Sequence, residues 1–428
     1  MPHPRWGKWS FMMRSPRAVL KGAGEKFTLS ENGGVKEITG DPFEILRGLI
    51  SRENVQTGGA EHIPFTGGVA GFWGYELLRW TEPAAKVPPR HAAEGDIWLG
   101  FYDSLIAFDH QAGKLWLVVN EPDDGGVSKA LDGLEQWIET SRNAGHHTGQ
   151  ETATSTTPVS GFTAESYALA VDKVRGYIER GDCYQANIAQ RFAARTNKDP
   201  KKLYLALRKI SPAPFAAYID TGATQILSSS PERFITLRDG AAQARPIKGT
   251  RPRGKTSEED ARLAEELYNS EKERAENLMI VDLLRNDLSK VCAPESVKVS
   301  SLFEVEKFAN VIHLTSTVEG TLKDNHSGID LLRASFPCGS VTGAPKIRAM
   351  EIIGEIEPEA RGVYCGAIGY MGHGGDMDLS VGIRLMTLSG GVASFYSGGG
   401  VTYPSNPLEE YEETLHKAKG IMEALEKA

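Results

Sequence analysis

A polar stretch near the middle of the chain sets the main limit on how it can fold. Residues 143–161 (NAGHHTGQETATSTTPVSG) carry almost no large apolar side chain, so they have little to bury, as is typical of a linker or long loop. At 428 residues the chain exceeds one standard core, so two domains or one large layered domain are expected. We predict an N-terminal part over residues 1–145, a linker over 146–160 and a C-terminal part over 161–428.

Composition and charge exclude several classes of protein. The chain is 40% hydrophobic and 24% charged, which is typical of a globular protein, and no apolar run reaches the length of a membrane span. A net charge of −8 argues against a nucleic-acid binder, which carries a basic surface. The four cysteines are widely spaced, so neither a disulfide framework nor a zinc site is indicated. Reduced thiols in a cytoplasmic protein are expected.

Hydrophobic periodicity predicts the elements on each side of the polar stretch. Before it, FYDSLIAFDH and KLWLVVN are predicted strands joined by a turn near Gly113, and residues 128–142 a helix. After it, AESYALAVDKVRGYIERGD is predicted to be helical and CYQANIAQRFAAR to be a strand. The capping spacings T-S-E-E and S-E-K-E, from Thr256 and Ser270, precede two more helical patterns, and a last helix follows Asn406.

Two helical segments carry an E-x-x-E pair. Glu273 and Glu276 form the first pair, and Glu410 and Glu413 the second. Residues three apart share one helix face, so each pair directs two carboxylates to the same side. Carboxylates around a small space need a cation, and oxygen ligands suit Mg²⁺. The alternative is a pair of solvated helix faces, which is the common case for this spacing.

A single lysine stands among arginines in RPIKGTRPRG, residues 245–254. Arg245 and Arg251 would disfavour a second positive charge on Lys248, and a neutral amine is a nucleophile. The alternative is a surface lysine at a turn.

A glycine-rich segment, SGGGVTYPS, lies just before the last helix. Its backbone N–H groups and the helix N-terminus suit a carboxylate or phosphate, and a glycine turn made only for geometry is the alternative. Lys417 lies four residues after Glu413, on nearly the same helix face.

Three more polar residues stand in apolar surroundings. Arg384, in SVGIRLMTL, is either paired inside the protein or directed at an anion. His313, in NVIHLTSTV, is either a core histidine or a site residue. Glu232, in LSSSPERF, ends a strand, and it is either a turn residue or a general acid whose pKa is raised by burial.

Taken together, these segments resemble one enzyme family. They follow one another as GDCYQANIAQRF, SSSPERF, PIKGTRPRG, ERAENLMIVDLLRNDLSKV, VIHLTSTVEG, FPCGSVTGAPKIRAMEII, RGVYCGAIGYM and EEYEETLHKA. In this order they are similar to the chorismate-utilising enzymes, with a match from Phe162 to the end of the chain. GKWSFMMRSP and PFTGGVAGFWGYE match more loosely, and the family's usual opening strand is expected to be absent.

The resemblance implies an α+β fold. Two large, roughly orthogonal antiparallel β-sheets would form a sandwich core with helices packed outside. Residues 1–145 would add strands to the same sandwich, and residues 161–428 would bind chorismate.

Two positions distinguish members of the family. Hydroxylating members resemble one another in a lysine where this chain has Gln185, whereas a glutamine fits ammonia as the nucleophile. P-I-K-G-T around Lys248 is similar to aminodeoxychorismate synthases, and anthranilate synthases show P-I-A-G-T. The implied activity is therefore that of a synthase component I that converts chorismate and ammonia to 4-amino-4-deoxychorismate, for 4-aminobenzoate and folate synthesis. Anthranilate synthase component I and a non-catalytic chorismate-binding regulatory subunit remain as alternatives.

The resemblance also assigns roles to residues. Lys248 would be a covalent nucleophile, Glu232 the general acid, and His313 a residue near the reacting face. Mg²⁺ would be bound directly by Glu276 and Glu413, with Glu273 and Glu410 acting through water. Substrate contacts would come from Gly249, Thr250, Ser340, Tyr364, Arg384, Gly399, Gly400 and Lys417.

The implied partners are a separate glutamine amidotransferase subunit, which supplies ammonia, and a downstream aminodeoxychorismate lyase. No nucleic-acid or membrane partner is expected. Pro404, Asn277 and Cys338 depart from the usual family residues at their positions, which affects local loop geometry but removes no proposed catalytic group.

Overall fold

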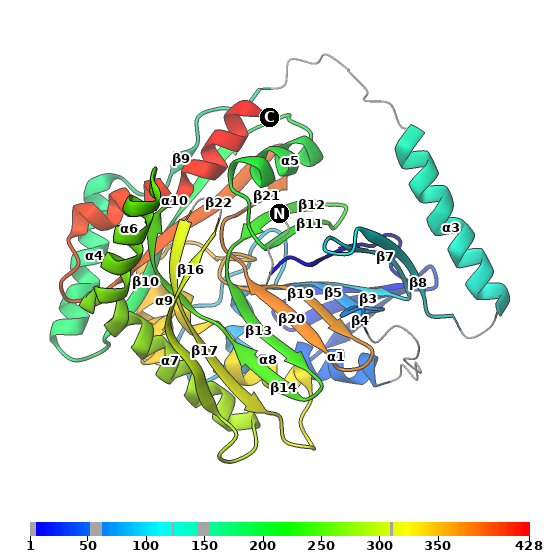
Figure 1. Cartoon of the computed structure of the whole chain (residues 1–428), viewed down its shortest axis with the longest axis horizontal. Coiled ribbons are helices and arrows are strands. Elements are labelled where there is room, and N and C mark those ends of the chain that lie inside the picture. The colour runs from blue at the N-terminus through cyan, green and yellow to red at the C-terminus, as the bar shows by residue number, and fades with distance from the viewer. Residues whose placement is uncertain (1–5, 52–61, 122–123, 144–153, 309–310) are drawn as a thin grey trace.

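Two large antiparallel sheets form the core of the molecule (Figure 1). The computed structural model describes residues 6–51, 62–121, 124–143, 154–308 and 311–428. Within these residues, the smaller of the two large sheets has seven strands. Their order is β11-β12-β21-β22-β10-β18, and β9 pairs with β10. Its strands are β9 (Val159–Ser160), β10 (Gln185–Arg195), β11 (Phe215–Asp220), β12 (Thr224–Ser230), β18 (Gly343–Ala344), β21 (Leu385–Ser389) and β22 (Val392–Val401).

The larger sheet has twelve strands within the described ranges. Its order is β15-β17-β14-β13-β20-β19-β5-β6-β2-β3-β4, with β16 paired to β17. The strands are β2 (Ala18–Ala23), β3 (Lys26–Glu31), β4 (Gly34–Thr39), β5 (Gly68–Trp73), β6 (Ile97–Tyr102), β13 (Arg233–Arg238), β14 (Ala241–Ala244), β15 (Ile247–Pro252), β16 (Lys298–Lys307), β17 (Val311–Thr321), β19 (Ala367–Gly372) and β20 (Met377–Val381). The predicted α+β class with two large antiparallel sheets is confirmed.

A small third sheet was not predicted. It joins β1 (Trp9–Met12), β7 (Ser104–Asp109) and β8 (Lys114–Val119). The prediction of FYDSLIAFDH as one strand is wrong. The strand is interrupted at Asp103, so β6 ends in the large sheet and β7 begins in the small one. The predicted turn at Gly113 is confirmed, and its positive φ of 63° suits glycine.

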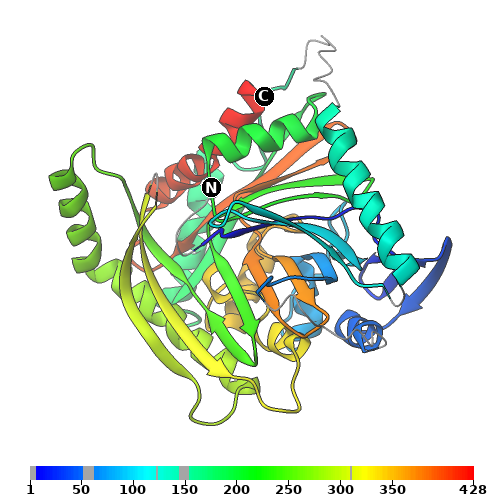
Figure 2. The same cartoon turned by 45° about the vertical axis from the view of Figure 1, so that its right-hand side comes forward.

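Helices cover the outer faces of both sheets. They are α1 (Pro42–Ile50), α2 (Leu78–Thr81), α3 (Asp124–Asn143), α4 (Ala164–Glu179), α5 (Pro200–Ile210), α6 (Ser257–Asn269), α7 (Glu271–Val291), α8 (Gly328–Ser335), α9 (Lys346–Ile356) and α10 (Pro407–Lys427), with short 3₁₀ turns η1 (Tyr75–Leu77) and η2 (Gly339–Val341). Figure 2 shows α6 projecting at one side of the molecule, beside the long strands β16 and β17. The predicted caps are confirmed, because Thr256 and Ser270 each accept a hydrogen bond from the N–H three residues later.

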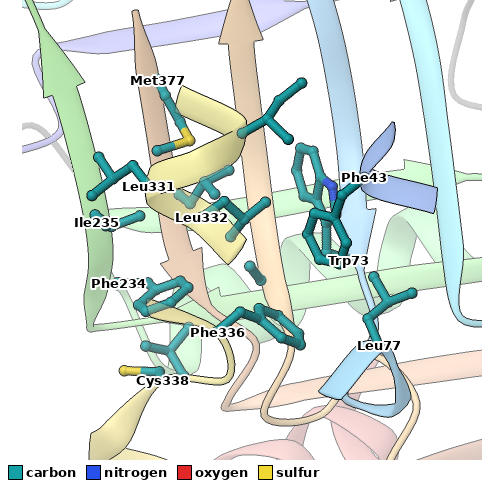
Figure 3. Packing of buried hydrophobic residues seen from close by; sticks show 14 of the residues in the cluster. Phe43, Trp73, Leu77, Phe234, Ile235, Leu331, Leu332, Phe336, Cys338 and Met377 are labelled. Carbon is teal, nitrogen blue, oxygen red and sulfur yellow. The ribbon is translucent and has the colours of Figure 1, made fainter. Parts of the chain in front are cut away.

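Different apolar clusters hold the layers together. Phe72 and Ile368 of the large sheet pack with Ile226 and Leu385 of the small one, so the sheets meet face to face. A larger cluster fills the space between the twelve-stranded sheet and its helices. Figure 3 shows side chains from α1, β5, β13 and α8 meeting there, with Leu332 among them.

At two points the chain passes directly from one of the two large sheets to the other, with no helix between the strands. Pro231 and Glu232 join β12 of the small sheet to β13 of the large sheet. Residues 382–384 make the return passage from β20 to β21. Both passages carry a residue that the sequence singled out, Glu232 and Arg384. The sheet topology therefore brings these two side chains to the seam of the sandwich.

Strands from both ends of the chain share the large sheet. β5 pairs with β19 from Gly68↔Gly372 to Trp73↔Ala367. The predicted linker falls largely on residues 144–153, which lie outside the described residues, and the boundaries at 145 and 161 stay a prediction. Within the described ranges, no helix combines the length and apolarity that a membrane crossing requires.

The α8 cluster gives a test of the core. Leu332 is fully buried, so Leu332→Ala is expected to lower the free energy of unfolding by about 2–5 kcal/mol, through lost apolar contact and the cavity left behind. Urea denaturation followed by tryptophan fluorescence measures this loss. The matched control is Leu205→Ala on α5, whose side chain is 60% exposed and whose change is expected to stay within about 0.5 kcal/mol. Equal losses in the two variants would contradict the packing described.

Candidate active site

Lys248 lies at the start of a bulge in β15. Its Nζ is 3.4 Å from the carbonyl oxygen of Ser340 in η2. The register of β15 against β17 shifts between Lys248 and Thr250, and Gly249 has a φ of 80°. A Cβ there would lie 2.9 Å from Glu273 Oε2, so glycine allows the bulge to approach α7 closely. Lys248, Gly249, Thr250, Ser340 and Glu273 are thus brought together.

Glu232 is a buried carboxyl group close to Lys248. Burial raises the pKa of Glu232, while the Ser340 hydroxyl, the Lys248 amine and the Ile247 N–H oppose that rise. Its Oε1 atom is buried and has no hydrogen-bond partner among the described residues. A buried carboxyl with a raised pKa and a vacant acceptor is suited to hold a proton and deliver it to a bound ligand.

The arginines near Lys248 do not act as the sequence suggested. Arg245 Nη2 pairs with Glu306 at 2.8 Å and with Glu304 at 3.1 Å, and Arg251 pairs with Glu266 and Glu273. The expectation that these arginines place free positive charge around Lys248 is therefore wrong. The residues that neutralise them lie far away in sequence, mainly on β16 and α6.

The four glutamates of the two E-x-x-E pairs lie on α7 and α10. Burial raises the pKa of Glu276, and the nearby charges of Glu273 and Glu410 add to the rise. Burial likewise raises the pKa of Glu410, whose Oε1 accepts from Ser405 Oγ at 2.7 Å. Burial acts to raise the pKa of Glu413 as well, but Lys417, 2.5 Å away, brings it below its usual value. Glu276 of the first pair is therefore close enough to Glu410 of the second for their charges to interact.

These carboxylates have the donor chemistry that Mg²⁺ prefers, since all are oxygen donors and like charges placed together require a cation. Across the described ranges, however, no group of three or more His, Cys, Asp or Glu side chains is gathered to hold a metal ion. Positive charge near the glutamates comes from lysines and from Arg251, which pairs with Glu273 at 3.4 Å. The positive charge of Lys272 acts to lower the pKa values of Glu276, Glu410 and Glu413.

The glycines of the glycine-rich segment lie in a strand, so the alternative of a glycine turn is wrong. Gly398, Gly399 and Gly400 belong to β22 and pair with β10. A Cβ on Gly399 would lie 3.0 Å from Glu410 Oε2 and 3.5 Å from Glu413 Oε1. The glycines therefore let α10 carboxylates lie directly against the strand backbone.

Gln185, at the start of β10, is fully buried beside this strand. Both of its side-chain amide atoms lack hydrogen-bond partners among the residues described, and a Cβ on Gly400 would lie 2.5 Å from its Nε2. Buried amides are normally satisfied, so these atoms are available to a bound ligand or to water.

Arg384 provides a positive charge at the seam of the two sheets. Burial lowers the pKa of its guanidinium, which donates to the carbonyl oxygen of Lys417 but forms no ion pair within the described ranges. Lys417 Nζ in turn donates to the carbonyl oxygen of Gly398 at 3.0 Å. A buried guanidinium without a carboxylate partner is costly, which favours the anion-binding interpretation of Arg384 over an internal pair.

His313 and Tyr364 complete the surroundings. His313 Nδ1 lies 2.9 Å from Thr250 Oγ1, and burial together with Arg384 lowers its pKa to about 4. The imidazole is therefore neutral near pH 7. Tyr364 is buried and stacks on Tyr396, with ring centroids 5.1 Å apart.

Sequence reasoning missed two residues that act on the glutamates. Lys272 lies four residues before Glu276, an ion-pair spacing on helices that was visible in the sequence. Ser405 binds Glu410 from the turn before α10, and no local pattern indicates this contact.

The three departures from the usual family residues are accommodated. Asn277 is buried and accepts from Ser316 Oγ at 2.5 Å. Cys338 Sγ lies 3.3 Å from Ser340 Oγ, and Pro404 lies in the turn before Ser405.

A cavity of about 380 Å³ lies elsewhere, between the segment around Tyr75 and Trp80 and the end of α9. The fully buried Arg361 lines it and also donates to the carbonyl oxygen of Val341, next to Ser340. The cavity therefore backs onto the site but does not contain its carboxylates.

The chain is similar to known proteins over nearly its whole length. Residues 9–423 match the model of a family described as chorismate binding enzyme. Aminodeoxychorismate synthase component 1 of Escherichia coli K12 is 39% identical over 99% of this chain and 91% of its own length. Anthranilate synthase component 1 of Acetivibrio thermocellus is 34% identical over 99% of this chain and 88% of its own length. The crystal structure of anthranilate synthase component I from Streptococcus pneumoniae TIGR4 superimposes with a TM-score of 0.85 at 33% identity, covering 97% of this chain and 92% of that one.

The state of His313 can be tested directly. With ¹⁵N-histidine labelling, NMR titration is expected to show the His313 ring neutral from pH 5 to 8 and protonating at about pH 4. Removing the nearby charge with Arg384→Gln is expected to raise this pKa, because Arg384 is one of the two causes that lower it. His313→Gln assigns the signal. A His313 midpoint above pH 6 in the parent protein would contradict the burial and charge described.

Proposed function

Because this chain belongs to the chorismate-binding enzymes, we propose that it is the synthase component that aminates chorismate to 4-amino-4-deoxychorismate. The observation that carries this proposal is Lys248 on the β15 bulge beside the buried Glu232. Relatives named aminodeoxychorismate synthase component 1, at 37–40% identity over nearly the whole chain, support it.

The chemistry explains the use of a lysine. Chorismate loses a hydroxyl at C4 and the product carries an amine there with the same stereochemistry, which one direct displacement does not give. In the proposed reaction the Lys248 amine adds at C2 and the C4 hydroxyl leaves as water. Ammonia then adds at C4 and expels Lys248, so the amine is regenerated. The covalent step divides one difficult displacement into two easier ones.

Glu232 is the proposed source of the proton for the leaving hydroxyl. Burial keeps its carboxyl protonated to higher pH than usual, and its unpartnered oxygen is free for the substrate. His313, neutral at pH 7, is positioned beside Thr250 without adding charge to the reacting face.

The dianionic substrate requires positive groups on two sides. Arg384 is partly buried and has no ion-pair partner in the described part of the chain, and Lys417 lies next to it. We propose that they bind one carboxylate, with Tyr364 and the glycine strand shaping the wall of the site.

Mg²⁺ fits the donor set of α7 and α10. Glu276 and Glu413 would hold the ion, with Glu273 and Glu410 acting through water. When bound, it neutralises a substrate carboxylate and fixes its position. In the structure, nearby lysine side chains supply positive charge to these glutamates.

We further propose that ammonia comes from a separate glutamine amidotransferase subunit. The component 1 names of the relatives imply a second component. Release of pyruvate from the product, to give 4-aminobenzoate for folate synthesis, would need a separate lyase.

Anthranilate synthase component I is the second candidate. The close superposition on the Streptococcus pneumoniae structure favours it, and relatives of that name are 34–38% identical. The anthranilate synthase reaction gives no explanation for a lysine at the β15 bulge, where Lys248 lies beside Glu232.

Product analysis with Lys248→Ala tests the proposal. Chorismate, Mg²⁺ and ammonium are expected to yield 4-amino-4-deoxychorismate, which an added lyase converts to 4-aminobenzoate. Loss of the nucleophile is expected to lower this rate by more than about 100-fold, as for other removed catalytic groups. The matched control is Lys255→Ala, an exposed lysine from the same segment, which is expected to keep full activity.

Other products would separate the alternatives. Fluorescent anthranilate as the main product would assign the chain to the second candidate and leave Lys248 without a covalent role. No turnover of chorismate by the parent protein would favour a non-catalytic, chorismate-binding regulatory subunit.

Metal removal gives a second test of the proposed function. EDTA is expected to abolish chorismate consumption, and excess Mg²⁺ to restore it. Glu413→Gln is expected to raise the Mg²⁺ concentration needed for half-maximal rate by about 10–100-fold, because a direct ligand loses its charge. Glu412→Gln, at an exposed neighbouring position on α10, is the control and should not change it. Activity that is unaffected by EDTA would refute the metal assignment.

A further inference from the structure

Trp6 lies outside the sheets but places its indole against the strands that carry the site. The guanidinium carbons of Arg233 and Arg245 each lie 4.8 Å from the centroid of the ring. The indole Nε1 donates to Glu306 Oε1 at 3.4 Å. One aromatic ring is therefore held by two cations and one carboxylate from distant parts of the chain.

The two arginines are fixed by contacts of their own. Arg233 Nε and Nη2 donate to the two carboxylate oxygens of Asp378 at 2.9 and 2.8 Å. Arg245 Nη2 pairs with Glu306 at 2.8 Å and donates to Thr315 Oγ1 at 3.0 Å. Such paired guanidinium groups lose little further freedom when a ring packs on them, so the ring and arginines form a rigid unit.

This unit is next in sequence to both proposed catalytic residues. Pro231 and Arg233, which flank Glu232, line the same small pocket as Trp6, and so does Ile247, which precedes Lys248. The Ile247 N–H also interacts with the Glu232 carboxyl. The pocket is small, about 20 Å³, and the indole forms part of its wall.

We infer that Trp6 is a positioning residue, whose indole ties the Glu232 turn to the start of β15 and so sets Glu232 relative to Lys248. The inference rests on the proposed function, in which Glu232 supplies a proton to the leaving hydroxyl. Trp6 itself acts through Arg233, Arg245 and Ile247.

Loss of the indole has two consequences. The flanks of Glu232 gain room to move, and displacements of about 1 Å at a reacting group cost up to about 100-fold in rate. Water also gains access to the side of the turn, and burial is the main cause of the raised pKa of Glu232. The pKa of the acid therefore falls. The other groups that face Glu232 stay in place: they are Lys248 on β15, Lys417 on α10, and Cys338 and Ser340 at η2.

The test is the pH profile of chorismate consumption by Trp6→Leu. A general acid must be protonated, so activity declines as pH rises through its pKa, and a lower pKa moves this basic limb to lower pH. We expect that shift together with a kcat lowered about 10–100-fold and a KM for chorismate changed less than about threefold, since the substrate carboxylates bind elsewhere. Partial unfolding lowers the height of a profile but does not move its limb.

Two further variants sharpen the test. Trp6→Phe keeps a ring between the arginines and loses only the Nε1 donor, so it is expected to restore most of kcat and the position of the limb. Trp9→Ala removes a nearby tryptophan that packs on Phe11 in the small sheet, with ring centroids 6.3 Å apart. This variant controls for lost stability. Its Tm is expected to fall, while the basic limb of its pH profile is expected to stay at the pH of the parent protein.

The inference is overturned if the basic limb of the pH profile of Trp6→Leu lies at the same pH as in the parent protein, whatever the height of the profile. So does a Trp6→Phe variant no better than Trp6→Leu. Because the readout is loss of chorismate, the test does not depend on the product. Formation of anthranilate by the parent protein would refute the proposed amination at C4. The role of Trp6 would then still be tested by the position of the basic limb of the pH profile.

Discussion

The site depends on hydrogen bonds that join the two passages between the sheets. Val381 N–H donates to the carbonyl oxygen of Glu232 at 3.0 Å, and Ser230 Oγ donates to the carbonyl oxygen of Val381 at 2.7 Å. One passage presents Glu232, and the other presents Arg384. Because both passages are tied at Val381, backbone groups limit the relative movement of Glu232, the proposed proton donor, and Arg384, the proposed anion-binding cation.

Burial gives these side chains their chemical properties. It raises the pKa of Glu232, lowers that of His313 and lowers that of Arg384. Each shift means that the charged form is less stable in the folded protein than in water. Apolar packing between sheets and helices offsets this cost, and the cost falls when a ligand supplies the missing partner. Unpartnered polar atoms at Glu232 and Gln185 are consistent with that arrangement.

Local signals predicted the elements better than they predicted the site. Helices α7 and α10 were predicted from caps and periodicity, since both signals lie within a few residues. The fold class followed from the family resemblance. The strand at Gly398–Gly400 was missed, because glycines carry no side-chain alternation and read as a turn. The pairing of Arg245 with Glu304 and Glu306 was also missed, because it joins residues about 60 positions apart in the chain, and no local pattern encodes such a contact.

Charge balance in the site supports the joint arrival of metal and substrate. Glu276, Glu410 and Glu413 are each influenced by a nearby lysine, Lys272, and Lys248 and Lys417 add further positive charge around them. Carboxylates and ammonium groups thus roughly compensate before any ligand binds. Arg384 forms no ion pair within the described ranges, so its charge is available for one carboxylate of the proposed substrate. A dianion brings a second negative charge that these groups leave uncompensated, and a buried charge without compensation is strongly disfavoured. A divalent cation between α7 and α10 removes that excess, so the proposed Mg²⁺ and the dianionic substrate each make the binding of the other more favourable.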